Sequence, residues 1–126
     1  MLVLDSGGVS RLAARSRQAA ALILALRDRD LWPPIVPSVV LVECLHGHAG
    51  RDAQANAFLK TCDIVEEVPE AIARRAALLR RKARRGSAVD ALLVALAEPD
   101  GTVVTGDTDD LEALAAHAER VRVERL

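Results

Sequence analysis

The chain has 126 residues, of which 51% are hydrophobic, 28% are charged and 2% are aromatic, and its formal net charge is −1. This length predicts one domain over residues 1–126, with a core of Ala, Leu and Val. This net charge is not the strongly positive one that is typical of nucleic-acid-binding domains, and two cysteines are too few for a disulfide framework. The longest apolar run, 19–26, is shorter than the roughly 20 residues of a membrane span, so we expect a soluble cytoplasmic protein with no membrane partner.

Strand and helix signals alternate along the chain. The apolar run 1–4 predicts a buried strand that ends at Asp5 and enters a loop. Further strands are expected at 35–36, 64–68, 102–105 and 121–123, and helices at 16–30, 38–47 (with Ser38 as its N-cap), 51–61, 69–85, 87–98 and 109–119. This alternation predicts an α/β fold with a mainly parallel sheet covered on both faces. Ligands of such sheets collect at the carboxyl ends of strands, where Asp5 and Asp107 fall.

Three acids lie in apolar surroundings: Asp5 after MLVL, Glu43 within VVLVECL and Asp90 within SAVDALLVALA. A buried, unpaired carboxylate is costly, so each needs a cation, a strong donor or a proton. We expect the Glu43 stem to point partly into the protein. Local explanations also exist: Asp5 can accept loop amides or cap the next helix, Glu43 can pair with a buried Arg, and Asp90 can form a capping box with Ser87.

The stretch TGDTDDLEAL adds further acids near the last strand. Asp107 can cap the last helix, while Asp109 and Glu112 have the spacing of an N-cap and its reciprocal acid. Strand ends and helix starts converge at one edge of a parallel sheet, where Asp5, Glu43, Asp90 and Asp107 would repel one another. Mg²⁺ or Mn²⁺ would remove that repulsion, which indicates metal-assisted phosphoester chemistry.

Four segments in this order resemble the PIN domain, and within it the VapC toxins of bacterial VapBC toxin-antitoxin pairs: VLDSG, VECLHG, SAVDALLVALA and TVVTGDTDDLEAL. The resemblance implies a PIN-like three-layer α/β/α sandwich with a central, mainly parallel sheet. It also implies a Mg²⁺- or Mn²⁺-dependent endoribonuclease, the toxin component of a type II toxin-antitoxin system. A homodimer and a cognate VapB-like antitoxin are the implied protein partners, and RNA is the implied substrate.

Carried over residue by residue, the resemblance implies a catalytic site of Asp5, Glu43, Asp90 and Asp107. Asp5, Asp90 and Asp107 would hold one or two ions, and Glu43 would position a water or act as a base. Asp110 is the possible outer member of the metal site. Ser6 and Thr105 would supply nearby hydroxyls, whereas Gly7 stands where such toxins often have a small polar residue.

The segment Arg74 to Arg85 is a basic run: Arg74, Arg75, Arg80, Arg81, Lys82, Arg84 and Arg85. An apolar stripe (Ile72, Ala76, Leu79 and Ala83) predicts that these cations face outward. Arg81, Arg84 and Arg85 are candidates to bind RNA phosphates, and the alternative is a solvated face whose cations suit a helix C-terminus.

Two other functions fit parts of the sequence. GDTDDLEAL is similar to the Gly-Asp motif of haloacid-dehalogenase-like phosphatases, in which a strand-end Asp is the nucleophile. That family needs a second acid two residues after the nucleophile, where this chain has Gly7. The second alternative function is that of a catalytically inactive PIN-like scaffold that binds RNA or a protein partner.

Overall fold

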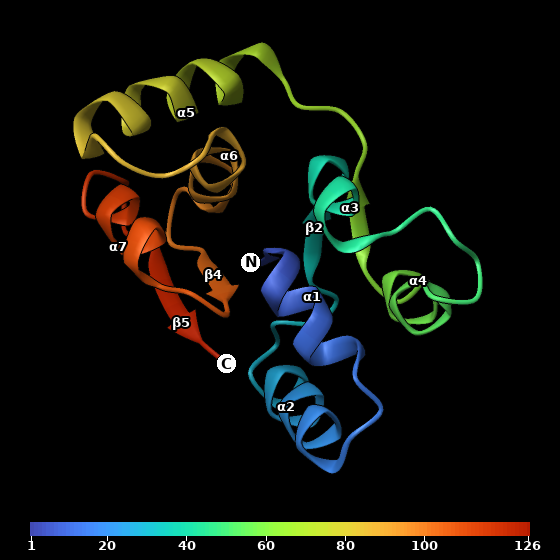
Figure 1. Ribbon diagram of the computed structural model, residues 1–126. Coiled ribbons are helices and arrows are strands. Elements are labelled where there is room, and N and C mark those ends of the chain that lie inside the picture. The colour runs from blue at the N-terminus through green and yellow to red at the C-terminus, as the bar shows by residue number, and fades with distance from the viewer.

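The computed structural model describes residues 1–126 and contains a central sheet with helices on both faces (Figure 1). The strands are β1 (Leu2–Leu4), β2 (Ile35–Pro37), β3 (Asp63–Val65), β4 (Thr102–Thr105) and β5 (Arg122–Arg125). The helices are α1 (Ser6–Ala13), α2 (Arg17–Asp28), α3 (Ser38–Cys44), α4 (Ala53–Leu59), α5 (Glu70–Ala83), α6 (Ala88–Ala97) and α7 (Asp109–Ala115). This three-layer arrangement confirms the predicted fold class.

All neighbouring strands are parallel, in the order β3-β2-β1-β4-β5. The chain passes from β1 toward β2 on one side, whereas β4 lies on the other side of β1. The carboxyl ends of β1 and β4 therefore form the topological switch point, where ligands of open α/β sheets bind. Leu4 is in register with Val104, so the next residues along the two chains, Asp5 and Thr105, lie side by side at the carboxyl ends of β1 and β4.

The two central strands have apolar, buried sequences because helices cover both of their faces. Leu2, Val3 and Leu4 of β1 and Val103 and Val104 of β4 are almost fully buried. Helices α1 to α4 lie over one face and α5 to α7 over the other, as right-handed crossovers require (Figure 1). No helix is long and apolar enough to cross a membrane.

The segment after β1 is a helix, which corrects the expected loop. Asp5 is the N-cap of α1: its backbone is extended, and its carboxylate accepts from the Gly8 amide at 2.6 Å. The glycines that suggested a loop instead allow close packing. A Cβ at Gly8 would lie 2.8 Å from the Val104 carbonyl oxygen, so α1 approaches β4 closely only because this side chain is absent.

Two predicted N-caps are wrong, although α3 and α7 begin at Ser38 and Asp109 as predicted. Ser38 is the first residue of α3 and follows the N-cap Pro37, and its hydroxyl donates to the Glu66 carbonyl at 3.1 Å. Asp109 is the first residue of α7 rather than its N-cap, which is Thr108. Both helices are also shorter than predicted: α3 ends at Cys44, because Leu45 has an extended backbone, and α7 ends at Ala115. By contrast, Ser16 and Ser87 cap α2 and α6 with their hydroxyls.

We predict that Gly8→Ala lowers the free energy of unfolding by about 1–3 kcal/mol, because the added methyl group meets backbone that cannot rotate away. Gly106→Ala is the matched control, since a Cβ there meets only the Gly7 Cα at 3.9 Å. Urea unfolding followed by circular dichroism measures both variants. Equal stability of the two variants would contradict the close packing of α1 on β4.

Candidate active site

Thr105 joins the ends of β1 and β4. Its buried hydroxyl donates to the Asp5 carboxylate and accepts from the Asp107 amide at 3.0 Å. The hydroxyl thus holds the Asp5 side chain and the start of the β4–α7 loop in fixed relation. Ser6, the other expected hydroxyl, is the first residue of α1.

Asp90 lies in the first turn of α6 and forms the capping box expected from the sequence. Its carboxylate accepts from the Ser87 amide at 3.2 Å, and the Ser87 hydroxyl accepts from the Asp90 amide at 3.0 Å. The side chain is half-buried. Capping does not remove its negative charge, which contributes to the electrostatics of Asp5.

The pKa of Asp5 is raised, chiefly because burial disfavours the charged carboxylate. Hydrogen bonds from Thr105 and Gly8 oppose this effect, whereas the charge of Asp90 adds to it. Some acids elsewhere in the chain are paired: Glu98 contacts Arg75 at 2.7 Å, and Asp100 contacts Arg120 at 2.6 Å. Asp5 and Asp90 have no such cation.

Glu43 lies at the surface, which corrects the expectation that its stem points into the protein. In α3 only Val40 is buried, and Val42, next to Glu43, is 82% exposed. Apolar neighbours in sequence did not bury Glu43 because this short helix packs on only one side. The buried Arg considered as its partner is absent, and the Glu43 carboxylate has no ion pair.

The acids of the β4–α7 segment have different surroundings. Asp107 is exposed, and its carboxylate accepts from the Asp109 amide at 3.3 Å without capping α7. Asp110 forms an ion pair with Arg85 at 2.7 Å. Asp107 is therefore free of a cation, whereas the charge of Asp110 is balanced within the chain.

The side chains form no ready-made group of three or more metal ligands. Asp5, Asp90 and Asp107 each accept a hydrogen bond from a local donor. The donor chemistry nevertheless fits a hard divalent cation, since carboxylate oxygens are the ligands that Mg²⁺ and Mn²⁺ prefer. The Asp5 carboxylate has no cation partner within the chain, and a bound divalent ion would supply one.

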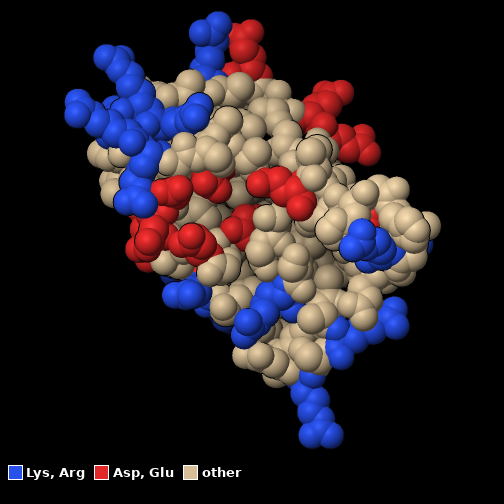
Figure 2. Space-filling view, in the orientation of Figure 1, with Lys and Arg blue, Asp and Glu red and all other residues tan.

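Charges are sorted on the surface that carries these acids. Figure 2 shows acidic side chains gathered at the centre of one face, where α1, α3, α6 and α7 meet in Figure 1, with basic side chains on either side. In the basic run, Arg74, Arg75 and Arg85 have carboxylate partners, and Arg80 donates to the Gly86 carbonyl. Arg81, Lys82 and Arg84 have none, so their charges are available to a ligand.

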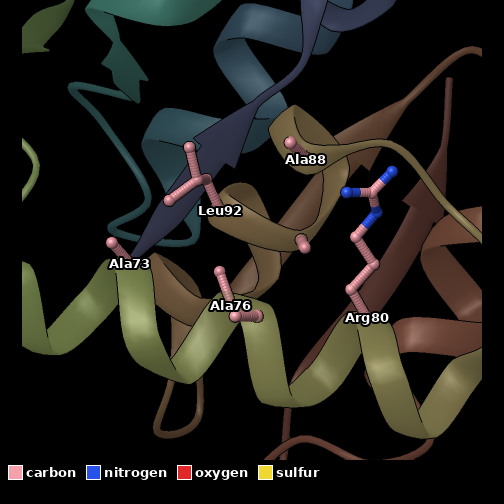
Figure 3. A pocket seen from close by; sticks show the side chains of 7 residues that line it. Ala73, Ala76, Arg80, Ala88 and Leu92 are labelled. Carbon is pink, nitrogen blue, oxygen red and sulfur yellow. The ribbon is translucent and has the colours of Figure 1, made fainter.

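A separate groove of about 230 Å³ lies between α5 and α6 (Figure 3). Six of its seven lining residues are hydrophobic, and Arg80 stands at one end. It contains no carboxylate, hydroxyl or thiol. The groove suits apolar contacts and lacks the carboxylates that would bind a divalent cation.

Sequence reasoning missed the structural role of Asp52. This carboxylate is buried, with 4% of the residue exposed, and accepts from the backbone amides of His46, Gly47 and His48. Those hydrogen bonds lower its pKa. They also fix the loop that follows α3, the helix that carries Glu43. An acid a few residues after a Gly-containing turn is the only local signal for this arrangement.

Comparisons with known proteins agree with the fold. The PIN domain family model matches residues 2–117, and the chain therefore belongs to the PIN domain family. Proteins of this family are generally nucleases, which supports a hydrolase that acts on nucleic acid. No curated protein sequence gives a significant match.

A solved structure has the same fold at low sequence identity. It is the crystal structure of VapBC2 from Rickettsia felis bound to a DNA fragment from their promoter. The matched chain is 13% identical, and the alignment covers 100% of this chain and 99% of the other with a TM-score of 0.70.

The raised pKa of Asp5 predicts an unusual pH dependence of stability in metal-free buffer. The folded state holds the proton more tightly than the unfolded state, so Asp5 lowers stability as pH rises from its usual pKa of 3.8 through the raised value. Asp5→Asn, which keeps a capping oxygen, should therefore gain stability relative to wild type over that window and keep the gain at neutral pH.

Glu98→Gln is the control of opposite sign. The Arg75 guanidinium lowers the pKa of Glu98. The contribution of the Glu98 carboxylate to the stability of the fold is therefore present above its usual pKa of 4.5 and is lost as pH falls through the lowered value. Urea unfolding at a series of pH values in EDTA measures both differences. A stability difference for Asp5→Asn that shrinks as pH rises would contradict the arrangement described for Asp5.

Proposed function

We propose that this protein is a metal-dependent endoribonuclease that hydrolyses RNA phosphodiester bonds, and that it is the toxin component of a type II toxin-antitoxin system in the cytoplasm. The observation that carries the proposal is the set of carboxylates without ion pairs around the switch point of a PIN domain. Asp5, Asp90 and Asp107 form this set, and Glu43 adds an unpaired carboxylate from α3, which packs against α1, whereas Asp110 is paired with Arg85. Unpaired cations beside the acids suit a polyanionic substrate.

In the proposed site, Asp5, Asp90 and Asp107 hold one or two Mg²⁺ or Mn²⁺ ions. When bound, a divalent ion supplies positive charge that lowers the pKa of an attacking water and stabilises the phosphodiester in the transition state. Thr105 keeps the Asp5 carboxylate oriented through its hydrogen bond. Glu43, exposed at the rim, orients the attacking water or takes its proton.

The outer parts of the site have supporting roles. Asp110 stays outside the metal ligands and holds Arg85 against α7. Arg81 and Arg84 bind RNA phosphates that flank the scissile bond, because the last turn of α5 leads within a few residues into the first turn of α6, which carries Asp90. Arg85 contributes positive charge at the same edge while it remains paired.

The proposal includes two protein partners: a VapB-like antitoxin and a second copy of this chain. The resemblance of the four sequence segments and the fold shared with a chain of the VapBC2 structure support the antitoxin. Exposed apolar surface supports protein contacts in general. It includes Leu24 and Val42, which are 61% and 82% exposed, and the groove between α5 and α6.

The two alternative functions are less well supported. A haloacid-dehalogenase-like phosphatase needs an acid at position 7, and a Cβ at Gly7 would already lie 3.0 Å from the Gly106 backbone nitrogen. An inactive RNA- or partner-binding scaffold leaves the unpaired acids Asp5, Asp90 and Asp107 without a use. Both alternatives make different predictions in the assay below.

We expect the purified protein to cut structured RNA in Mg²⁺ or Mn²⁺ and not in EDTA. Asp5→Asn, Asp90→Asn and Asp107→Asn should each lower the cleavage rate by about 100-fold or more, because each removes a ligand charge. Glu43→Gln should lower it by about 100-fold through loss of a general base. Gel electrophoresis of labelled RNA measures the rates.

Glu112→Gln is the control, since this exposed acid of α7 lies outside the proposed site. It should cut RNA like wild type. Equal cleavage by wild type and the Asp variants, or no cleavage with either metal, would refute the nuclease. Turnover of para-nitrophenyl phosphate without RNA cleavage would favour the phosphatase, and RNA binding without cleavage would favour the scaffold.

Metal binding has a readout that does not depend on activity. Mn²⁺ at about 100 times its dissociation constant should stabilise the folded state by about 2.7 kcal/mol and raise the melting temperature. Asp5→Asn should lose most of this increase, whereas Glu112→Gln should keep it. The same increase in wild type and Asp5→Asn, measured by differential scanning fluorimetry, would exclude Asp5 as a ligand.

A further inference from the structure

A second groove lies directly beside the proposed catalytic acids. It has a volume of about 410 Å³, and its lining includes Gly7, Ser10 and Arg11 of α1, Gly106 of the β4–α7 loop and Arg125 of β5. Gly7 lies two residues after Asp5, and Gly106 immediately precedes Asp107. Two residues of the groove lining are therefore close in sequence to the proposed metal ligands Asp5 and Asp107.

Two glycines bring the elements of this groove together. A Cβ at Gly7 would lie 3.0 Å from the Gly106 nitrogen, so the first turn of α1 and the β4–α7 loop can approach this closely only without that side chain. The same absence leaves backbone at the groove wall. A ligand can approach such a wall more closely than one covered by side chains.

Two arginines from distant parts of the chain line the groove without a carboxylate partner. Arg11 and Arg125 are exposed and form no ion pair. Glu124, the acid next to Arg125, is engaged by Arg29 at 2.9 Å. No acidic side chain lines the groove, which Ala14 and Leu126 complete, and the Ser10 hydroxyl adds a further hydrogen-bonding group to the lining.

We propose that this groove binds the phosphate backbone of single-stranded RNA next to the cleaved bond, with Arg11 and Arg125 as phosphate-binding residues. The proposal rests on the proposed ribonuclease function. Guanidinium groups suit phosphate because their planar donors match its oxygens. Figure 2 shows basic side chains both near α5 and, across the acids, near α1 and the C-terminal end of β5 in Figure 1. An RNA strand thus meets positive charge on both sides of the acids.

The test measures affinity for a fluorescein-labelled single-stranded RNA by fluorescence anisotropy in EDTA, so that metal-dependent cleavage does not interfere. Arg11→Gln and Arg125→Gln should each weaken binding by roughly threefold to tenfold and reduce the slope of log affinity against log salt by about 0.7. Arg17→Gln is the matched control, because Arg17 is an exposed, unpaired residue of α2 outside the groove. Unchanged melting temperatures would establish that the variants fold.

RNA affinities of Arg11→Gln and Arg125→Gln equal to that of Arg17→Gln would overturn the proposal. So would a result in which both substitutions weaken binding of polyglutamate and leave the affinity for RNA unchanged. The second result would identify an acidic peptide as the ligand. These outcomes are distinct from failure of the nuclease. If wild type cuts RNA and the arginine variants bind it normally, only the groove is excluded; if wild type never cuts RNA, the anisotropy measurement still decides whether the groove binds it.

Discussion

The parallel pairing of β1 with β4 is the constraint on which the rest of the structure depends. It makes the two central strands end side by side, so that Asp5 and Thr105 lie at the same edge although they are far apart in sequence. The Thr105 hydroxyl then connects the Asp5 side chain to the Asp107 backbone. The small residues Gly7, Gly8 and Gly106 allow α1 and the β4–α7 loop to pack against this edge. The site is thus a consequence of strand order and close backbone packing.

Electrostatics explains why the acids are arranged as they are. Asp5 has a raised pKa because it is buried and near Asp90, and neither carboxylate has a cation within the chain. Hydrogen bonds from Gly8, Thr105 and Ser87 satisfy the oxygen atoms without cancelling the charges. By contrast, Glu98 pairs with Arg75, and Asp110 of the same edge pairs with Arg85. The contrast separates carboxylates that stabilise the fold from those that remain available for a divalent ion.

The parts of the fold that were predictable from sequence are those set by local pattern. Apolar runs located the central strands, and Ser87 with Asp90 indicated the capping box of α6. The same kind of reasoning missed α1, because two consecutive glycines suggest a loop unless the packing of Gly8 against β4 is known. It also placed Glu43 partly inside, since the sequence of α3 does not reveal that the Val42 side of the helix has no partner.

Contacts between distant residues account for most of what the sequence did not reveal at the site. The pairing of Arg85 with Asp110 spans 25 residues and assigns different surroundings to acids that looked equivalent. The groove that joins Arg11 to Arg125 depends on the two ends of the chain coming together. In each case the individual residues have ordinary local patterns. Their roles can be inferred only when the strand order of the sheet brings these residues to one edge.

Crystals of the protein grown with Mn²⁺ test the central claim most directly, because anomalous scattering identifies the ion and its ligands. We predict an anomalous peak bounded by the carboxylates of Asp5, Asp90 and Asp107, with Asp90 turned away from the Ser87 amide and Glu43 beside the ion. A structure with no peak between these residues, at a Mn²⁺ concentration that supports RNA cleavage, would contradict it.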